Sequence, residues 1–329
     1  MSSTDPKYRV LVTPRSFGAD DPALRDELLA AVGDVLWRQE GNLGTGELAD
    51  AVAEADGWIA GVERIDRTVI EAAPRLRVIA RYGVGVANVD LRAAADRGIT
   101  VTNTPGANSA AVAELVIGMV FALARRIAFA DAEVRRGRWP RIRGIAVEGK
   151  TVGLLGFGAI GREVGRRARS LGCRVLAFDP APVGDAAAAA GVELAPREEV
   201  VATSDFLSLH VPVTGETEGM VDAAFLARMK RGSHLINAAR GELVDEAALV
   251  DALRAGHLAG AALDSLAVEP PAAGFALGQL DQVVLTPHVG AHTDAAAAAM
   301  GRAAVANCLA VLRGEPVPNP VAAPAEVPR

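Results

Sequence analysis

The sequence predicts an α/β fold with two doubly wound parallel sheets. Short apolar runs of β-forming residues alternate with helical patterns along most of the chain, which is typical of parallel sheets covered by helices. The chain has 329 residues, enough for about two domains of ~100–200 residues each. A glycine-rich turn between an apolar run and a helical pattern opens the second series of alternations.

The first third of the chain has the pattern of a flavodoxin-like unit. Apolar runs predict its strands, and the segments between them have helical patterns. The predicted strands are Tyr8–Thr13, Gly57–Ala60, Arg77–Ala80 and Ile99–Thr102, and the predicted helices are Pro22–Val32, Gly46–Ala55, Thr68–Ala73 and Leu91–Arg97.

A long apolar helix and a second alternating unit follow. The helix is expected from about Asn108 to Arg126, and a continuation past Asp131 is left open. The second unit has the number of strands that a dinucleotide-binding domain requires. These strands are Thr151–Leu155, Arg174–Phe178, Phe206–Leu209, His234–Asn237, Gly260–Leu263 and Val283–Leu285. A helix over Asp294–Leu312 and a Pro- and Ala-rich tail, expected to be poorly ordered, close the chain.

The composition argues against several classes of function. The net charge of −6 argues against non-specific binding to nucleic acid or to anionic membranes. Cys173 and Cys308 lie in apolar surroundings without metal-site spacing, so buried free thiols and no metal are expected. The apolar run Ala107–Ala124 contains polar residues and is interpreted as a core helix rather than a membrane span. No signal peptide is visible, so a cytoplasmic location is expected.

The most informative motif is the glycine-rich turn after the strand Thr151–Leu155. Gly156 permits the tight turn, Gly158 leaves room for a pyrophosphate, and Gly161 lets the following helix pack closely. The amino terminus of that helix offers free N–H groups to phosphates. Asp179 ends the next strand, about 20 residues further on, where an acid binds the adenosine ribose. A carboxylate there repels a 2′-phosphate, which predicts NAD rather than NADP.

Further short motifs follow one another along the chain. They are Arg81–Asp90, Asn103–Ser109 with Val112–Leu115, Gly156–Gly161, Ser204–Pro212, Leu235–Asp245, Ala262–Asp264 with Glu269–Pro270, and Thr286–Ala291. In this order and spacing they resemble the D-isomer-specific 2-hydroxyacid dehydrogenases, and within that family the D-3-phosphoglycerate dehydrogenase-like group. The resemblance covers the chain from Val10 to about Leu312.

The resemblance implies a Rossmann cofactor domain inserted into a flavodoxin-like substrate domain. Residues 1–104 and 292–329 would form the substrate domain, and residues 105–291 the NAD-binding domain. The active site is expected in the cleft between them, and the protein is expected to be a homodimer that pairs through the cofactor domain. The sequence ends without the C-terminal regulatory domains of some phosphoglycerate dehydrogenases, so feedback by serine through such a domain is not expected.

The resemblance assigns catalysis to Arg240, Glu269 and His288. Reduction of a 2-oxo acid places negative charge on the carbonyl oxygen, which must be protonated, and an imidazole suits that role near neutral pH. Glu269 would bind the far nitrogen of the His288 ring and fix its tautomer. The guanidinium of Arg240 would hold the substrate carboxylate and polarise the carbonyl.

The resemblance also places residues at the cofactor. Asp264 would accept a hydrogen bond from the nicotinamide carboxamide, and His210 would line the adenine side. Ala159 and Ile160, in the first turn of the helix after the glycine turn, and Ala238 complete these expected contacts. No function is assigned to His234, His257 or His292.

The loop after the strand Arg77–Ala80 is expected to bind the anionic substrate. Small residues let the N–H groups of Val84 and Gly85 approach its carboxylate. Arg81 is the candidate for a second anionic group, such as a phosphate on C3. For Arg81, and for Arg15 and Ser16 after the first strand, a surface role is an equal alternative.

Three functions remain open at this stage. The leading one is oxidation of 3-phosphoglycerate to 3-phosphohydroxypyruvate, or its reverse. The second is reduction of glyoxylate, hydroxypyruvate or a bulkier 2-oxo acid, including one with a phosphonate or sulfonate group. The third is a non-catalytic NAD-sensing protein like the family's corepressor relatives, against which the complete catalytic set argues. Ala87 and Leu266 depart from the residues common in the family, which leaves the choice of substrate open. The direction of the reaction and the choice between dimer and tetramer are open as well.

Overall fold

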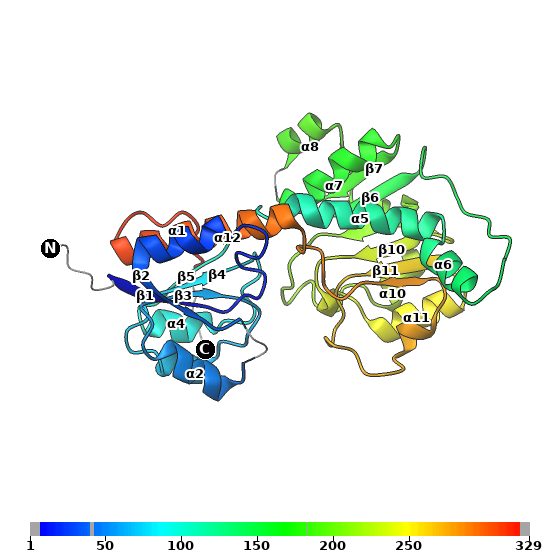
Figure 1. Cartoon of the computed structure of the whole chain (residues 1–329). Coiled ribbons are helices and arrows are strands. Elements are labelled where there is room, and N and C mark those ends of the chain that lie inside the picture. The colour runs from blue at the N-terminus through cyan, green and yellow to red at the C-terminus, as the bar shows by residue number, and fades with distance from the viewer. Residues whose placement is uncertain (1–6, 40–42, 182, 323–329) are drawn as a thin grey trace. The chain divides into compact units, whose positions relative to one another are not determined.

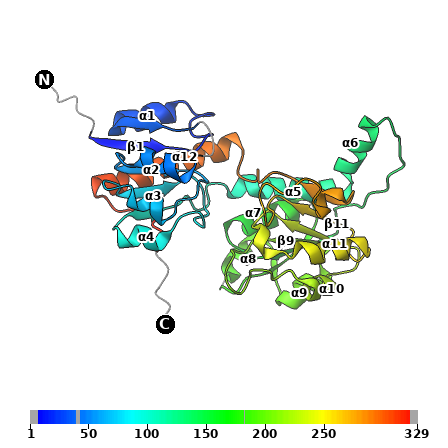
Figure 2. The ribbon, with the colours of Figure 1, turned by 90° about the horizontal axis from the view of Figure 1, so that it is seen from below.

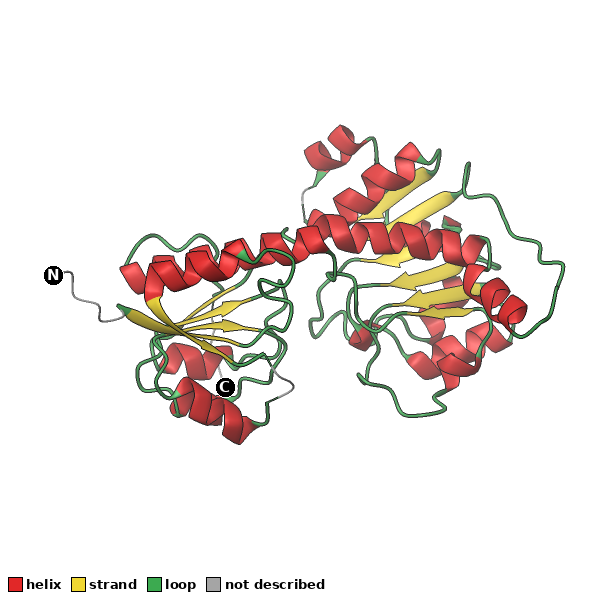
Figure 3. Ribbon diagram, viewed as in Figure 1, coloured by secondary structure: helices red, strands yellow, loops and turns green. Residues whose placement is uncertain are grey.

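The computed structural model describes residues 7–39, 43–181 and 183–322. It divides into two compact units, the first made of Met1–Asn108 with His292–Arg329 and the second of Ser109–Ala291. The second unit is therefore inserted into the first, which extends past the expected boundary at Thr104. Each unit is a sheet with helices on both faces (Figure 3).

The first unit contains a five-stranded parallel sheet in the order β2-β1-β3-β4-β5. Its strands are β1 (Tyr8–Val12), β2 (Gly33–Trp37), β3 (Gly57–Ala60), β4 (Val78–Arg81) and β5 (Thr100–Thr102). This is the flavodoxin-like order, which confirms the predicted fold class. The edge strand β2 was not predicted.

Two layers of helices cover this sheet (Figure 1, Figure 2). On one face lie α1 (Ala23–Val32) and α12 (Asp294–Arg313), and on the other lie α2 (Thr45–Val52), α3 (Arg67–Glu71) and α4 (Leu91–Asp96). By length and composition α12 could cross a membrane, but 56% of its apolar window is buried inside the protein. Since it packs on β3 and β4, we interpret it as a core helix of this unit.

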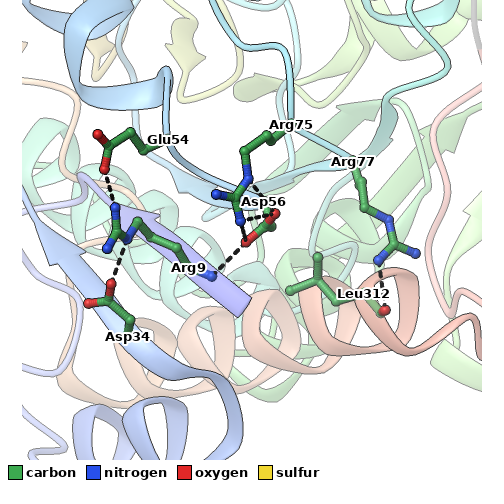
Figure 4. A network of polar contacts seen from close by, with 7 residues as sticks. All are labelled: Arg9, Asp34, Glu54, Asp56, Arg75, Arg77 and Leu312. Atoms are coloured by element: carbon green, nitrogen blue, oxygen red, sulfur yellow. Dashed lines mark hydrogen bonds and ion pairs between the residues drawn. The ribbon is translucent and has the colours of Figure 1, made fainter. Parts of the chain in front are cut away.

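A polar network ties the amino ends of these strands together. Figure 4 shows its members, Arg9, Asp34, Glu54, Asp56, Arg75, Arg77 and Leu312. Asp56 accepts the backbone N–H of Arg9 at 2.8 Å and Nη2 of Arg75 at 2.9 Å. Arg77 donates to the carbonyl oxygen of Leu312 at 3.0 Å, so a cation lies at the negative end of the α12 dipole.

The tail beyond α12 is partly paired with the sheet. Pro320 forms an antiparallel bridge with Thr102, and the N–H of Val321 donates to the carbonyl oxygen of Val101 at 2.8 Å. The expectation of a poorly ordered tail is therefore wrong for this stretch. Residues 323–329 lie outside the described residues.

The second unit contains a seven-stranded parallel sheet in the order β12-β11-β10-β9-β6-β7-β8. Its strands are β6 (Thr151–Leu155), β7 (Arg174–Phe178), β8 (Glu193–Leu194), β9 (Phe206–Leu209), β10 (His234–Asn237), β11 (Gly260–Leu263) and β12 (Val283–Leu285). The order reverses between β6 and β9, which creates the crevice where doubly wound sheets bind dinucleotides. All six predicted strands are present, and the two-residue β8 is an addition.

Helices cover both faces of the second sheet as well (Figure 1). One core lies against α5 (Ser109–Ala124), α7 (Ala159–Ser170) and α8 (Gly184–Ala190), and the other against α9 (Arg197–Thr203), α10 (Ala223–Arg228) and α11 (Glu246–Arg254). The long apolar helix ends at Ala124, close to its expected end at Arg126. Arg126 has a φ of 51°, and a separate helix, α6 (Ile127–Arg135), follows it.

Both cysteines are free and buried, as the sequence predicts. Burial raises the pKa of the Cys308 thiol to about 12 and also raises that of Cys173. Neither thiol is therefore a ready nucleophile at neutral pH.

Candidate active site

The residues singled out in the second unit follow directly after its strands. Gly156 follows β6, Asp179 follows β7, His210 follows β9, Ala238 follows β10, Asp264 follows β11 and Thr286 follows β12. Because all these strands are parallel, their carboxyl ends share one edge of the sheet. Sites of doubly wound proteins lie at this edge.

The glycine turn has the geometry that a dinucleotide requires. Gly156 has a φ of +96°, and a Cβ added there would lie 2.4 Å from the carbonyl oxygen of His210. A Cβ on Gly161 would lie 2.4 Å from the carbonyl oxygen of Gly156. A Cβ on Gly158, in contrast, would meet no atom within 4 Å. The fold thus needs glycine at positions 156 and 161, whereas Gly158 leaves open space beside the amino end of α7.

Asp179 joins this turn to the end of β7. Its Oδ2 accepts the N–H of Phe157 at 2.6 Å, and its Oδ1 accepts the N–H of Ala181 at 2.8 Å. Gly158 is the N-cap residue of α7, so Ala159 and Ile160 begin the first helical turn. An open glycine turn, a helix amino terminus and an acid beside them fit a dinucleotide with an unphosphorylated ribose.

His210 has a buried ring nitrogen next to the glycine turn. Its Nε2 is buried and has no hydrogen-bond partner among the described residues. Burial lowers the pKa of His210 to about 4, so the imidazole is neutral at pH 7. The predicted contacts of His210 and Ala238 with the cofactor stay predictions.

The structure brings Glu269 and His288 together. Nδ1 of His288 lies 2.8 Å from Oε2 of Glu269, and the two side chains are 47% and 39% exposed. A carboxylate at Nδ1 favours the tautomer with the proton on that atom. The opposite nitrogen, Nε2, is then the ring atom that can exchange a proton with a substrate.

Arg240 lies in the turn after β10, which Asn237 shapes. The Nδ2 of Asn237 donates to the carbonyl oxygen of Arg240 at 2.7 Å. The guanidinium of Arg240 donates to the carbonyl oxygen of Ala239 at 2.7 Å, its single hydrogen bond to the described residues. Most of its N–H groups therefore remain for a ligand.

The loop after β11 packs tightly against this turn. A Cβ on Gly241 would lie 2.0 Å from the carbonyl carbon of Leu266, so only glycine allows the two loops to approach. The N–H of Leu266 donates to Oε1 of Glu269 at 2.9 Å. The segment that carries Glu269 is thus built against the residue that follows Arg240.

Sequence reasoning missed the residue that fixes this loop from outside. Oε1 of Glu246 accepts the N–H of Ala267 at 2.8 Å. Glu246 is the first residue of α11, and an acid there is ordinarily explained by the helix dipole. The sequence carried no signal for its link to a loop 21 residues away.

Asp264 is almost fully buried, at 2% exposure. Its Oδ1 accepts Oγ1 of Thr286 at 2.6 Å and the N–H of Val289 at 2.8 Å, and its Oδ2 accepts the N–H of Gly290 at 2.8 Å. The predicted contact with the nicotinamide carboxamide stays a prediction. In this structure the carboxylate faces the loop that carries His288.

In the first unit, Arg81 ends β4 and is 5% exposed. Its Nε donates to the carbonyl oxygen of Gly85 at 3.0 Å, and its Nη1 donates to those of Ala60, at 2.7 Å, and Gly61. The guanidinium therefore organises the following loop, and its predicted contact with a substrate phosphate stays a prediction.

The loop after Arg81 presents backbone donors. None of the described residues accepts a hydrogen bond from the N–H groups of Val84 and Gly85. These two groups fit the predicted anion cradle. Arg15 is exposed, and Oγ of Ser16 contacts the hydroxyl of Tyr82 at 3.4 Å.

Comparison with known proteins agrees with this geometry. Residues 117–290 match the family model of the D-isomer specific 2-hydroxyacid dehydrogenase, NAD binding domain. D-3-phosphoglycerate dehydrogenase 2, chloroplastic, of Arabidopsis thaliana is 40% identical over 99% of this chain and 52% of its own length. The glyoxylate reductase of Korarchaeum cryptofilum is 39% identical over 86% of this chain and 88% of its own length.

A solved structure matches along nearly the whole chain. The crystal structure of a Thermus thermophilus protein superposes with a TM-score of 0.85 at 41% identity, over 95% of this chain and 100% of the other. The chain spans about half the length of several phosphoglycerate dehydrogenases that it matches. The glycine turn and Asp179 lie within an NAD binding domain of this family. The chain belongs to the D-isomer specific 2-hydroxyacid dehydrogenase family.

Proposed function

We propose that this protein is an NAD-dependent oxidoreductase that transfers a hydride between nicotinamide and C2 of a small D-2-hydroxy or 2-oxo acid. The observation that carries the proposal is the His288–Glu269 pair, at 2.8 Å, on the same sheet edge as the dinucleotide turn. We further propose the pair 3-phosphoglycerate and 3-phosphohydroxypyruvate as substrate and product. The relatives named D-3-phosphoglycerate dehydrogenase support this choice.

The proposed roles follow from the chemistry of the residues. When bound, NADH supplies the hydride that C2 of the 2-oxo acid receives. The imidazole of His288 then gives its Nε2 proton to the carbonyl oxygen, and Glu269 stabilises the charged ring through Nδ1. The guanidinium of Arg240 holds the carboxylate and orients C2. In the oxidative direction His288 accepts the hydroxyl proton.

The first test is NADH consumption with a panel of 2-oxo acids. We expect turnover by the wild-type protein and a loss of about 10²–10⁴-fold in the His288→Ala variant, because general acid–base catalysis is removed. Binding of NADH, followed by fluorescence, serves as the control for an intact cofactor site. An unchanged rate in the variant would remove His288 from the mechanism, and a wild-type protein inactive on every acid would leave the NAD-sensing alternative.

The second candidate substrate class is the unphosphorylated 2-oxo acids. The relative named glyoxylate reductase, of which the chain covers 88%, favours it. A kinetic screen of 3-phosphohydroxypyruvate against hydroxypyruvate, glyoxylate and pyruvate decides between the two. A preference for the phosphorylated acid supports the first proposal, and the reverse preference supports the second.

We also propose that the protein is a cytoplasmic homodimer that pairs through the second unit. Large apolar side chains are exposed on α6 and on the segment that follows it: Ile127, Val134, Trp139 and Ile145, with Trp139 87% exposed. Burial of such a surface against a second copy removes apolar area from water. Light scattering after size exclusion should give the mass of two chains, and a monomer would contradict the proposal.

A further inference from the structure

We infer that Asp264 is a positioning residue for His288, with a buried carboxylate that holds the loop carrying the proton-transferring imidazole. The inference rests on the proposed function for the role of His288. It assigns Asp264 a task in addition to the predicted contact with the cofactor.

The hydrogen bonds of Asp264 converge on both sides of His288. Before it, Oγ1 of Thr286 donates to Oδ1 at 2.6 Å. After it, the N–H groups of Val289 and Gly290 donate to Oδ1 and Oδ2, each at 2.8 Å. The N–H of His288 itself donates to the backbone carbonyl oxygen of Asp264 at 2.9 Å. One residue thus binds the turn immediately before, at and after the imidazole.

The backbone of His288 requires such support. Its φ is 53°, in the left-handed region that residues with a Cβ rarely occupy. A residue keeps this left-handed conformation only where several surrounding contacts hold it in place. The bonds to Asp264 from Thr286 and from Val289 fix the chain on either side of that residue.

Asp264 is itself anchored in the sheet. It follows directly after β11, and its N–H donates to the carbonyl oxygen of Asn237, in the neighbouring strand β10, at 2.9 Å. A Cβ on Gly290 would lie 3.0 Å from Oδ2 of Asp264, so the close approach uses the missing side chain of that glycine. The sheet edge therefore sets the position of the His288 loop through Asp264.

A carboxylate suits this place better than an amide. Its oxygens accept three hydrogen bonds, two from backbone N–H groups and one from a hydroxyl. An asparagine would turn an NH₂ group toward at least one of these donors. Asp264→Asn thus changes the loop contacts while it keeps the size of the side chain.

The experiment is a double-mutant cycle between Asp264→Asn and His288→Gln. We expect Asp264→Asn to lower kcat by about 10²-fold through misplacement of the imidazole. The kcat is measured at NADH concentrations that saturate each variant, so a change in the Kd for NADH does not enter the result. In the His288→Gln background the same substitution should have no further effect on kcat, because a residue that acts through His288 has nothing left to position. Asp222→Asn, which removes a carboxylate from the N-cap of α10, is the matched control and should leave kcat unchanged.

Two results would overturn the inference. One is an increased Kd for NADH with kcat retained at saturating NADH, which would make Asp264 a cofactor contact. The other is multiplication of the two effects in the cycle, which would show independent action. If Asp264→Asn does not fold, Thr286→Val serves instead, because it removes a single donor to Asp264. It should give a smaller loss of kcat, which should disappear in the His288→Gln background. An undiminished loss of kcat in that background would contradict the inference.

A wild-type protein inactive on every 2-oxo acid would end the proposed function but would still leave the loop contact testable. Amide hydrogen exchange at Val289 and Gly290 should then be faster in Asp264→Asn than in the wild type. Equal exchange would show that the carboxylate does not hold the loop.

Discussion

The His288–Glu269 pair should contribute more to the proposed chemistry than to the stability of the fold. The side chains of His288 and Glu269 are both more than one-third exposed, so water screens the attraction between them. The short contact at Nδ1 still selects the tautomer and aims Nε2 away from the carboxylate. Removal of the Glu269 carboxylate should therefore lower kcat and leave the free energy of unfolding almost unchanged.

The substitution Glu269→Gln tests that statement. The amide keeps an acceptor for one of the two donors, Nδ1 of His288 or the N–H of Leu266, and removes the charge that steadies a protonated ring. We expect kcat for reduction to fall by about 10–100-fold, by analogy with the loss when the carboxylate partner of a metal-bound histidine is changed. Thermal unfolding should stay close to that of the wild type, and a large drop in the unfolding temperature without loss of kcat would contradict this interpretation.

His210 should make the stability of the second unit depend on pH. Its folded pKa of about 4 lies below the ordinary value of 6.5 because the ring is buried, so the unfolded chain binds more protons between these two values. The free energy of unfolding should therefore be highest above pH 6.5 and fall by up to about 3 kcal/mol as the pH drops to 4. Urea unfolding at several pH values should show this slope in the wild type and a smaller slope in His210→Gln. Equal slopes would mean that burial does not lower the pKa of His210 in the folded protein.

The sequence predicted residues better than it predicted their contacts. The family resemblance paired His288 with Glu269, and the structure places them in contact. The bonds of Asp264 to the His288 loop and of Glu246 to Ala267 join loops from different strands. Such bonds depend on the register of the folded sheet, which residue types and spacing along the chain do not contain.

At the scale of elements, strands in the middle of a sheet were the easier ones to predict. Every predicted strand of the second unit is present with its bounds, because a strand buried on both faces is a continuous apolar run. Of the four edge strands, β5 and β12 were predicted, whereas β2 and β8 were missed. β2 begins with Gly33 and Asp34, which are unfavourable in strands, and β8 has only two residues. The end of α5 was predicted to within two residues, but whether the helix continues was left open, since neither Gly nor Pro marks the break.

The turn between β6 and α7 offers a matched pair of substitutions. A Cβ at position 156 would collide with the backbone of His210, whereas a Cβ at position 158 would enter open space. Gly156→Ala should therefore destabilise the protein, because a positive φ and a clash act together. Gly158→Ala should keep the unfolding temperature of the wild type and weaken NADH binding, because its methyl group occupies space expected for the pyrophosphate. Equal NADH affinity in Gly158→Ala and the wild type would place the cofactor elsewhere.

At the scale of the whole molecule, the two units differ in how the chain builds them. The core clusters of the second unit consist only of residues between Ser109 and Ala291. The first unit needs α12 from the far end of the chain, since Cys308 and Leu312 lie beside Gly57 in β3. The alternation of strands and helices predicted two sheets, but this return of the chain came only from the family resemblance, because local pattern does not record which distant segments pack together.

Expression of the two parts as fragments tests this division. Residues 109–291 should fold alone, with cooperative thermal unfolding, and should bind NADH, because both faces of their sheet keep their own helices. Residues 1–108 should fail to fold, because without α12 one face of their sheet loses apolar cover and exposes buried side chains of β3 and β4 to water. Circular dichroism and NADH fluorescence measure both outcomes, and the longer fragment with Gly158→Val is the control for specific binding. A stably folded 1–108 fragment would show that α12 is dispensable for that sheet, and an unfolded 109–291 fragment would show that the inserted unit depends on the one around it.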